Sequence, residues 1–85
     1  MKQFRYSITD PEGIHARPAG KLVKVSKQFQ SAIAITKEEK SADAKRIFGI
    51  MGLGVKQSQE IQVTAEGEDE EEAIAALENF LKENL

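Results

Sequence analysis

The residues with the clearest chemical potential lie together in the stretch from Gly13 to Ala19. This stretch holds His15, the only histidine of the chain, and Arg17 follows two residues later. Pro18 comes next and suits the first turn of a helix, because its missing N–H would have no intrahelical partner there. An imidazole, a guanidinium and the free N–H groups of a helix start together attract an anion. These residues predict a site for a phosphoryl group, which a guanidinium can hold with paired hydrogen bonds.

His15 also has a simpler interpretation, as a surface or capping residue that takes no part in chemistry. A second possible phosphate loop is the glycine-rich segment 46–55. Its glycine spacing fits neither of the common nucleotide-binding motifs, and no lysine followed by serine or threonine comes after it. The stretch around His15 is therefore the main candidate site.

Length and composition limit the class of protein. The 85 residues are enough for one domain over residues 1–85 with a modest core. The absence of cysteine excludes disulfides, and a chain with one histidine and no thiol is not expected to bind zinc or another metal. We also expect no cofactor. We expect a cytoplasmic protein without membrane insertion, because neither a signal peptide nor a long apolar run is visible. The net charge of −2 argues against nucleic-acid binding.

The charges are distributed unevenly along the chain. No acidic residue occurs between residues 13 and 37, whereas all but one position from Glu66 to Glu72 is acidic. Most charge runs are simply solvated faces. The cations that begin beside His15 instead favour docking to an acidic partner, whose approach they would steer. This basic stripe consists of Arg17, Lys21, Lys24 and Lys27.

Four segments alternate between apolar and polar residues, which is typical of strands with one buried face. The predicted strands span residues 4–9, 32–36, 41–44 and 60–66. Residues 37–40 would form a hairpin turn, although the usual glycine or asparagine is absent.

Three segments show helical spacing. We expect a helix over residues 16–28, a short helix that ends at Gly54, and a last helix that begins after Asp69. Asp69 and Glu72 resemble a capping box. The order β-α-β-β-α-β-α with one-sided strands predicts helices on one face of a sheet. The expected inward positions of the helices are Ala16, Ala19, Leu22, Val23, Ser26, Ile47, Ile50, Leu53, Ala73, Ile74, Leu77, Phe80 and Leu81.

The motif from Gly13 to Ala19, the element order and the length together resemble the HPr family. These proteins are the histidine-containing phosphocarriers of the bacterial sugar phosphotransferase system. The likeness also includes Phe29, the segment 45–55 and the segment 67–70 before the last helix. It implies an α+β fold, the open-faced β-sandwich, in which three helices cover one face of a four-stranded antiparallel sheet.

The resemblance further implies a stoichiometric carrier rather than an enzyme. Phospho-enzyme I would donate a phosphoryl group to Nδ1 of His15, and the EIIA domains of sugar permeases would receive it. Arg17 and the amides at the helix start, including that of Ala16, would hold the phosphate. The alternative is an HPr-like regulatory module that binds a partner without carrying phosphate. Retention of both His15 and Arg17 favours the carrier, and we expect a monomer.

Partner contact in this family uses the first two helices. From the residues alone, the apolar members of that surface have a second interpretation as core residues. The matching positions here are Ala16, Arg17, Gly20, Lys24, Lys27, Ile47, Phe48 and Met51.

Three positions depart from the family pattern. Many members carry at position 46 a serine that a dedicated kinase phosphorylates, whereas this chain has Arg46, so we expect that switch to be absent. Glu39 stands where the hairpin often has glycine. Glu12 replaces a small or polar residue and is expected to place a carboxylate near His15.

Overall fold

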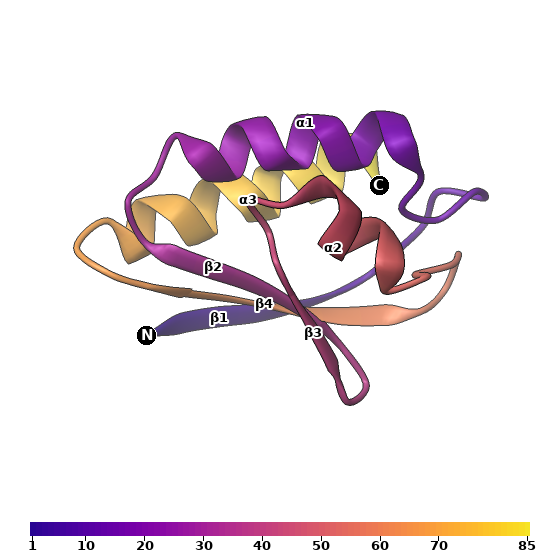
Figure 1. Cartoon of the computed structure of the whole chain (residues 1–85), viewed down its shortest axis with the longest axis horizontal. Helices are drawn as coiled ribbons and strands as arrows, with labels where there is room; N and C mark the ends of the chain where they lie inside the picture. Colours follow the sequence, from indigo (N-terminus) through magenta and orange to yellow (C-terminus); the bar gives the residue numbers. More distant parts are fainter.

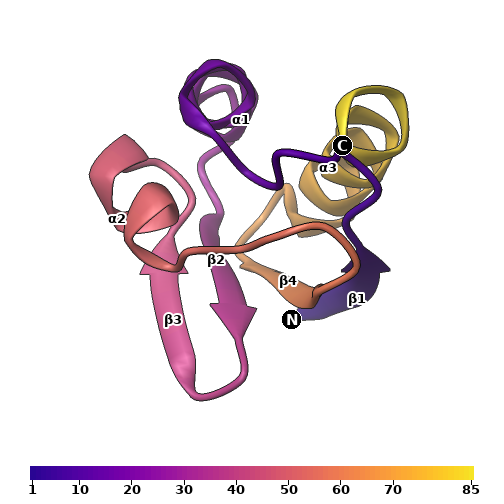
Figure 2. The same cartoon turned by 90° about the vertical axis from the view of Figure 1, so that its right-hand side faces the viewer.

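The protein is described by a computed structural model that covers residues 1–85. Its elements are β1 (Lys2–Ser7), α1 (Ala16–Lys27), β2 (Ala32–Lys37), β3 (Lys40–Asp43), α2 (Ile47–Gly52), β4 (Glu60–Glu66) and α3 (Glu70–Asn84). The strands form one antiparallel sheet in the order β1-β4-β2-β3. The three helices lie on one side of this sheet (Figure 1), and the end-on view in Figure 2 shows the other face uncovered. The predicted open-faced β-sandwich is confirmed.

The core fills the layer between the helices and the sheet. The alternation predicted for β2 and β4 is confirmed, because the buried residues of these strands lie at every second position and point into this layer. The buried residues of the two strands are Ile33, Ile35, Ile61, Val63 and Ala65. The helices bury their own apolar residues against them, namely Ala19, Leu22, Ile50, Ala73, Leu77 and Leu81. Burial of this apolar layer is the main force that holds the helices on the sheet.

The predicted buried face of α1 is confirmed at Ala19, Leu22 and Ser26 but is wrong at two other positions. Ala16 is exposed and Val23 is only half-buried, whereas Pro18 is buried. Pro18, Leu22 and Ser26 follow one another at intervals of four residues, so they form one row along the helix. The buried Ser26 hydroxyl donates a hydrogen bond to the carbonyl of Leu22 at 2.8 Å, which satisfies its polar group.

Several other boundaries also shift. β1 ends at Ser7 rather than at residue 9, although Ile8 beyond its end is still buried. α2 ends at Gly52 rather than at Gly54. Its Ile47 is half-buried instead of fully buried, as are Ile74 and Phe80 of α3, which pack against the edge of the core.

The β2–β3 hairpin closes with a two-residue turn. Lys37 pairs with Lys40, and Glu38 and Glu39 form the turn between them. Glu38 has a φ of 56°, in the left-handed region that favours glycine. The strained position of this turn is therefore Glu38, and not Glu39, where the family often has glycine.

The predicted capping box of α3 is wrong. Asp69 is the N-cap residue, but its side chain makes no capping hydrogen bond. Its carboxylate instead accepts the amides of Gln30 at 2.8 Å and Ser31 at 2.9 Å, together with the Ser31 hydroxyl. The carboxylate of Glu70, rather than that of Glu72, accepts the local amide of Gly67 at 3.1 Å. Asp69 therefore ties the loop after α1 to the start of α3.

These bonds make the stabilising effect of Asp69 dependent on pH. The Ser31 hydroxyl, followed by the Gln30 amide, lowers the pKa of Asp69 from its ordinary value of 3.8. A carboxyl whose pKa is lower in the folded state stabilises the fold above its unfolded pKa, and this contribution is lost as the pH falls through the folded value. We therefore expect Asp69→Asn to lower the melting temperature at neutral pH, with a difference from the parent that shrinks below about pH 4.

Thermal unfolding followed by circular dichroism across this pH range measures the effect. Glu68→Gln is the matched control, because it removes one negative charge from the neighbouring exposed residue. A melting-temperature difference for Asp69→Asn that stays constant down to about pH 2 would contradict the assignment.

Candidate functional site

A short loop fixes the position of His15. Gly13 has a φ of 69°, and its amide donates to the carbonyl of Asp10 at 2.9 Å. A Cβ atom on Gly13 would lie 2.2 Å from the carbonyl oxygen of Val55, so only glycine lets the loop pass this close to the segment after α2. The amide of the buried Ile14 donates to the same Val55 oxygen at 3.0 Å. His15 follows directly from this anchored pair.

His15 occupies the N-cap position of α1 with an extended backbone, but its side chain makes no capping hydrogen bond. Its carbonyl accepts the amide of Ala19 at 3.0 Å, which begins the helical pattern. The amides of Ala16 and Arg17 precede that bond and have no intrahelical acceptor. The helix start therefore presents two free donors and its partial positive charge next to an imidazole that is 37% exposed.

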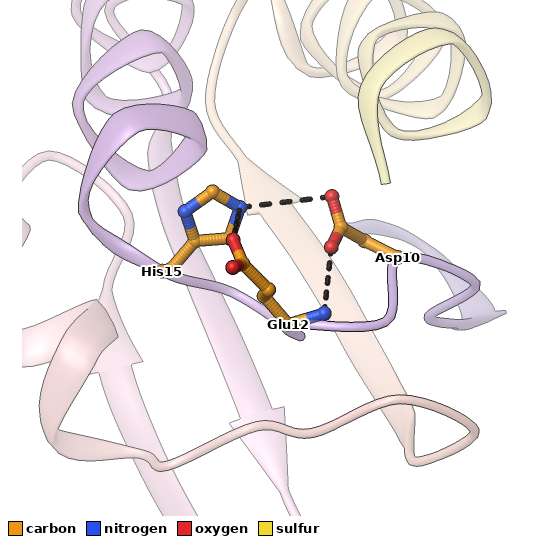
Figure 3. A group of neighbouring side chains, drawn as sticks. All are labelled: Asp10, Glu12 and His15. Carbon is orange, nitrogen blue, oxygen red and sulfur yellow. Dashed lines mark hydrogen bonds and ion pairs between the residues drawn. The ribbon is translucent and has the colours of Figure 1, made fainter.

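Two carboxylates lie beside the imidazole (Figure 3). Nε2 of His15 is 3.4 Å from Oε2 of Glu12 and 3.6 Å from Oδ2 of Asp10. The sequence predicted the approach of Glu12 but missed Asp10. The Asp10 carboxylate accepts a hydrogen bond from the amide of Glu12 at 2.8 Å. Aspartate side chains often form such a turn with the amide two residues further along the chain. This turn signal, in the Asp10-Pro11-Glu12-Gly13 stretch, could have identified Asp10.

The same three side chains are the one group in the structure with ligand atoms arranged for a metal ion. The ligand atoms of Asp10, Glu12 and His15 all lie within 4.8 Å of one another. Oxygen and imidazole ligands of this kind suit divalent transition metals. The sequence predicts no metal because it offers a single histidine and no thiol, and no step proposed below uses one.

Arg17 and His15 line the same shallow hollow. The hollow has a volume of about 150 Å³, and Lys21, Asp10 and Asn84 complete much of its wall. The wall of this hollow therefore holds two cations of α1, Arg17 and Lys21, and one carboxylate of the preceding loop, Asp10. Arg17 is exposed and forms no ion pair within the chain, so its guanidinium is free for an external anion.

A larger hollow, of about 700 Å³, lies elsewhere on the molecule. It lies over the uncovered face of the sheet, and small strand residues such as Ala32, Ala34 and Thr64 line it. It contains no histidine, so the size of a hollow does not mark the chemical site in this protein.

The predicted partner positions come together on α1 and α2, which lie next to each other in Figure 2. A Cβ atom on Gly20 would lie 3.8 Å from Cδ1 of Ile47, so the two helices approach closely there. Phe48 is 86% exposed and Met51 is 40% exposed, which excludes the interpretation of these two residues as core. The four cations of the basic stripe are exposed as well. The role of these residues in partner binding stays a prediction.

Arg46 is the N-cap residue of α2 and is open to solvent. Its Nε atom lies 3.9 Å from Oδ2 of Asp43, with 82% of the arginine side chain exposed. Exposed pairs of this kind contribute little to stability. Arg46 is therefore a surface position that a partner protein can reach.

Comparisons with known proteins agree with this geometry. A sequence model of the PTS-HPr family, described as the PTS HPr component phosphorylation site, matches residues 2–83. The phosphocarrier protein HPr of Lysinibacillus sphaericus is 47% identical over 83 residues, which cover 98% of this chain and 94% of that protein. The histidine-containing phosphocarrier protein of a Mycoplasma superposes with a TM-score of 0.94 at 36% identity, over 96% of this chain and 93% of that one. An HPr dimer from Thermoanaerobacter tengcongensis gives a TM-score of 0.78 at 43% identity, over 98% and 95%.

The fold and these matches define a small phosphocarrier domain of the phosphotransferase type, a carrier rather than a catalyst. The chain belongs to the PTS-HPr family, and the resemblance drawn from its histidine motif is confirmed. None of its helices combines the length and the hydrophobicity needed to cross a bilayer. Because one relative is described as a dimer, the expected monomer stays a prediction.

Proposed function

We propose that this chain carries a phosphoryl group on His15 from phospho-enzyme I to the EIIA domains of sugar permeases, with residues 1–85 acting as one carrier domain. The observation that carries the proposal is the site itself. The single histidine lies at the start of α1, next to two unpartnered amides and in the same hollow as Arg17. Membership of the PTS-HPr family supports the same role.

In the loading step, the lone pair of Nδ1 attacks the phosphorus of the donor phosphohistidine. The donor P–N bond breaks, and its electron pair stays on the donor imidazole. The guanidinium of Arg17 and the amides of Ala16 and Arg17 neutralise the phosphoryl oxygens as they arrive. The partner enzymes supply the alignment of the two imidazoles, which explains why the isolated carrier is not a catalyst. In discharge His15 is the donor: a nucleophile of EIIA attacks the phosphorus, the P–N bond breaks, and its electron pair stays on Nδ1.

The docking surface in this proposal combines the basic stripe of α1 with an apolar patch on α2, formed by Ile47, Phe48 and Met51. Exposed apolar residues beside a reactive site mark interaction surfaces. Arg46 has no hydroxyl, so the serine kinase that regulates many family members has no acceptor at this position. The cytoplasmic location expected from the sequence stays a prediction.

Neutralising part of the basic stripe should weaken the electrostatic attraction that steers enzyme I toward this chain. We expect Lys24→Gln together with Lys27→Gln to slow association with enzyme I several-fold at low salt, because long-range attraction to an acidic partner is lost. The dependence of the association rate on ionic strength should also flatten, since screening acts within about 8–10 Å at physiological salt.

Stopped-flow association at several salt concentrations measures both effects. The matched control is Lys2→Gln together with Lys40→Gln, which removes the same charge from the sheet instead of from α1. Equal salt slopes for the parent and the α1 variant would show that the stripe is an ordinary solvated face.

The function itself is tested by incubating the chain with enzyme I and phosphoenolpyruvate and recording its intact mass. We expect the mass to increase by one phosphoryl group, the modification to be lost in acid, and the group to leave when EIIA is added. A chain that binds enzyme I but stays unmodified would refute the proposed carrier function. It would support the alternative, a regulatory module that binds a partner without carrying phosphate.

A further inference from the structure

We propose that Glu12 and Asp10 are positioning residues that favour one tautomer of His15, with the proton on Nε2 and the lone pair on Nδ1. The inference rests on the proposed function, because an unprotonated Nδ1 is the atom that takes the phosphoryl group. The two carboxylates act on the transferred group only through the imidazole.

The geometry puts both negative charges on one edge of the ring. Both carboxylates approach Nε2, at 3.4 Å for Glu12 and 3.6 Å for Asp10. Figure 3 shows the second ring nitrogen, Nδ1, on the other side of the ring, turned toward the start of α1. A proton on Nε2 faces two negative charges and is attracted to them. In the other tautomer the Nε2 lone pair would face the same carboxylates and be repelled.

The two carboxylates differ in how firmly they are held. The Asp10 side chain is 24% exposed and accepts the amide of Glu12, and the Asp10 amide donates to the main-chain oxygen of Leu85 at 3.0 Å. The Glu12 carboxylate lies nearer to Nε2 but is 74% exposed, so water screens it more. We therefore expect both residues to contribute, with Asp10 as the fixed charge. Arg17 and Lys21 line the same hollow and provide the opposite charge.

This arrangement suits the transfer step because no proton has to leave the ring. As Nδ1 forms its bond to phosphorus, the imidazole keeps the Nε2 proton and becomes positively charged. The carboxylates beside Nε2 stabilise that charge. During discharge the P–N bond breaks, its electron pair returns to Nδ1, and the ring becomes neutral with the same proton on Nε2.

Long-range ¹H–¹⁵N spectra of the histidine-labelled protein test the inference, because the two ring nitrogens report the tautomer ratio directly. Spectra are recorded where the imidazole is neutral and with a chelator present, which removes any metal from the three side chains. The variants are Glu12→Gln, Asp10→Asn and the double variant. Asparagine keeps an oxygen that can accept the Glu12 amide, so the loop is preserved. The control is Glu39→Gln, which removes one carboxylate from the β2–β3 turn.

We expect the ratio of the Nε2–H to the Nδ1–H form to fall about fivefold or more in the double variant and to stay unchanged in the control. An unchanged ratio in the double variant would overturn the inference, and so would an equal change in Glu39→Gln. Phosphoryl loading from enzyme I is measured by intact mass, independently of the tautomer ratio. A parent that never accepts phosphate refutes the proposed function, whereas a loaded parent with an unbiased ratio refutes only the role of the carboxylates.

Discussion

His15→Ala is expected to accept no phosphoryl group from phospho-enzyme I while keeping the fold of the parent. The chain has no second histidine to replace the lost imidazole. The side chain is partly exposed and makes no capping hydrogen bond, so its removal should change the free energy of unfolding by no more than about 0.5 kcal/mol. Intact mass after incubation with enzyme I and phosphoenolpyruvate measures phosphoryl acceptance. Urea denaturation measures the free energy of unfolding.

The control for this variant is binding to enzyme I without phosphoenolpyruvate. The proposed docking surface lies on α1 and α2, so we expect His15→Ala to bind with nearly the affinity of the parent. Acid-labile phosphate on His15→Ala would show that another residue is the acceptor.

Gly13→Ala is expected to destabilise the fold by about 2–5 kcal/mol. The new Cβ atom would lie 2.2 Å from the Val55 carbonyl oxygen and 2.7 Å from Cα of Lys56, and neither main-chain atom can move aside freely. The left-handed backbone costs a residue with a side chain about 1–2 kcal/mol, and overpacking adds about 1–3 kcal/mol. This is a large fraction of the stability of a small domain. Urea denaturation followed by circular dichroism measures the loss.

Gly52→Ala is the matched control, because a Cβ atom there would meet no other atom within 4 Å. It replaces glycine at the end of α2 and should be neutral or slightly stabilising. Equal stability of Gly13→Ala and the parent would mean that the loop before His15 is not held against Val55 as described.

The strands of the sheet could be predicted well because the alternation of apolar and polar residues is a local pattern in the sequence. Alternation along β4 assigns Ile61 and Val63 to the buried face without any information on contacts remote in sequence. The capping box failed for the opposite reason. Asp69 finds better partners at Gln30 and Ser31, almost 40 residues away in sequence, and no local pattern contains that information.

The candidate site was predicted in the same uneven way. His15, Arg17 and Pro18 stand out by residue type and spacing, and the matching family supports that reading. The approach of Asp10 depends on how the preceding turn folds back, and the exposure of Phe48 depends on how α2 rests on its neighbours. Periodicity cannot tell an exposed apolar residue on a short helix from a buried one.

The central claim, that this chain carries a phosphoryl group on Nδ1 of His15, is tested most directly by a ¹⁵N–³¹P spectrum of the loaded protein. The protein is labelled with ¹⁵N-histidine and charged with enzyme I and phosphoenolpyruvate. We predict one phosphorus signal coupled to Nδ1 of His15, which disappears when EIIA is added. A phosphorus signal on any other atom, or none at all in a chain that still binds enzyme I, would contradict the claim.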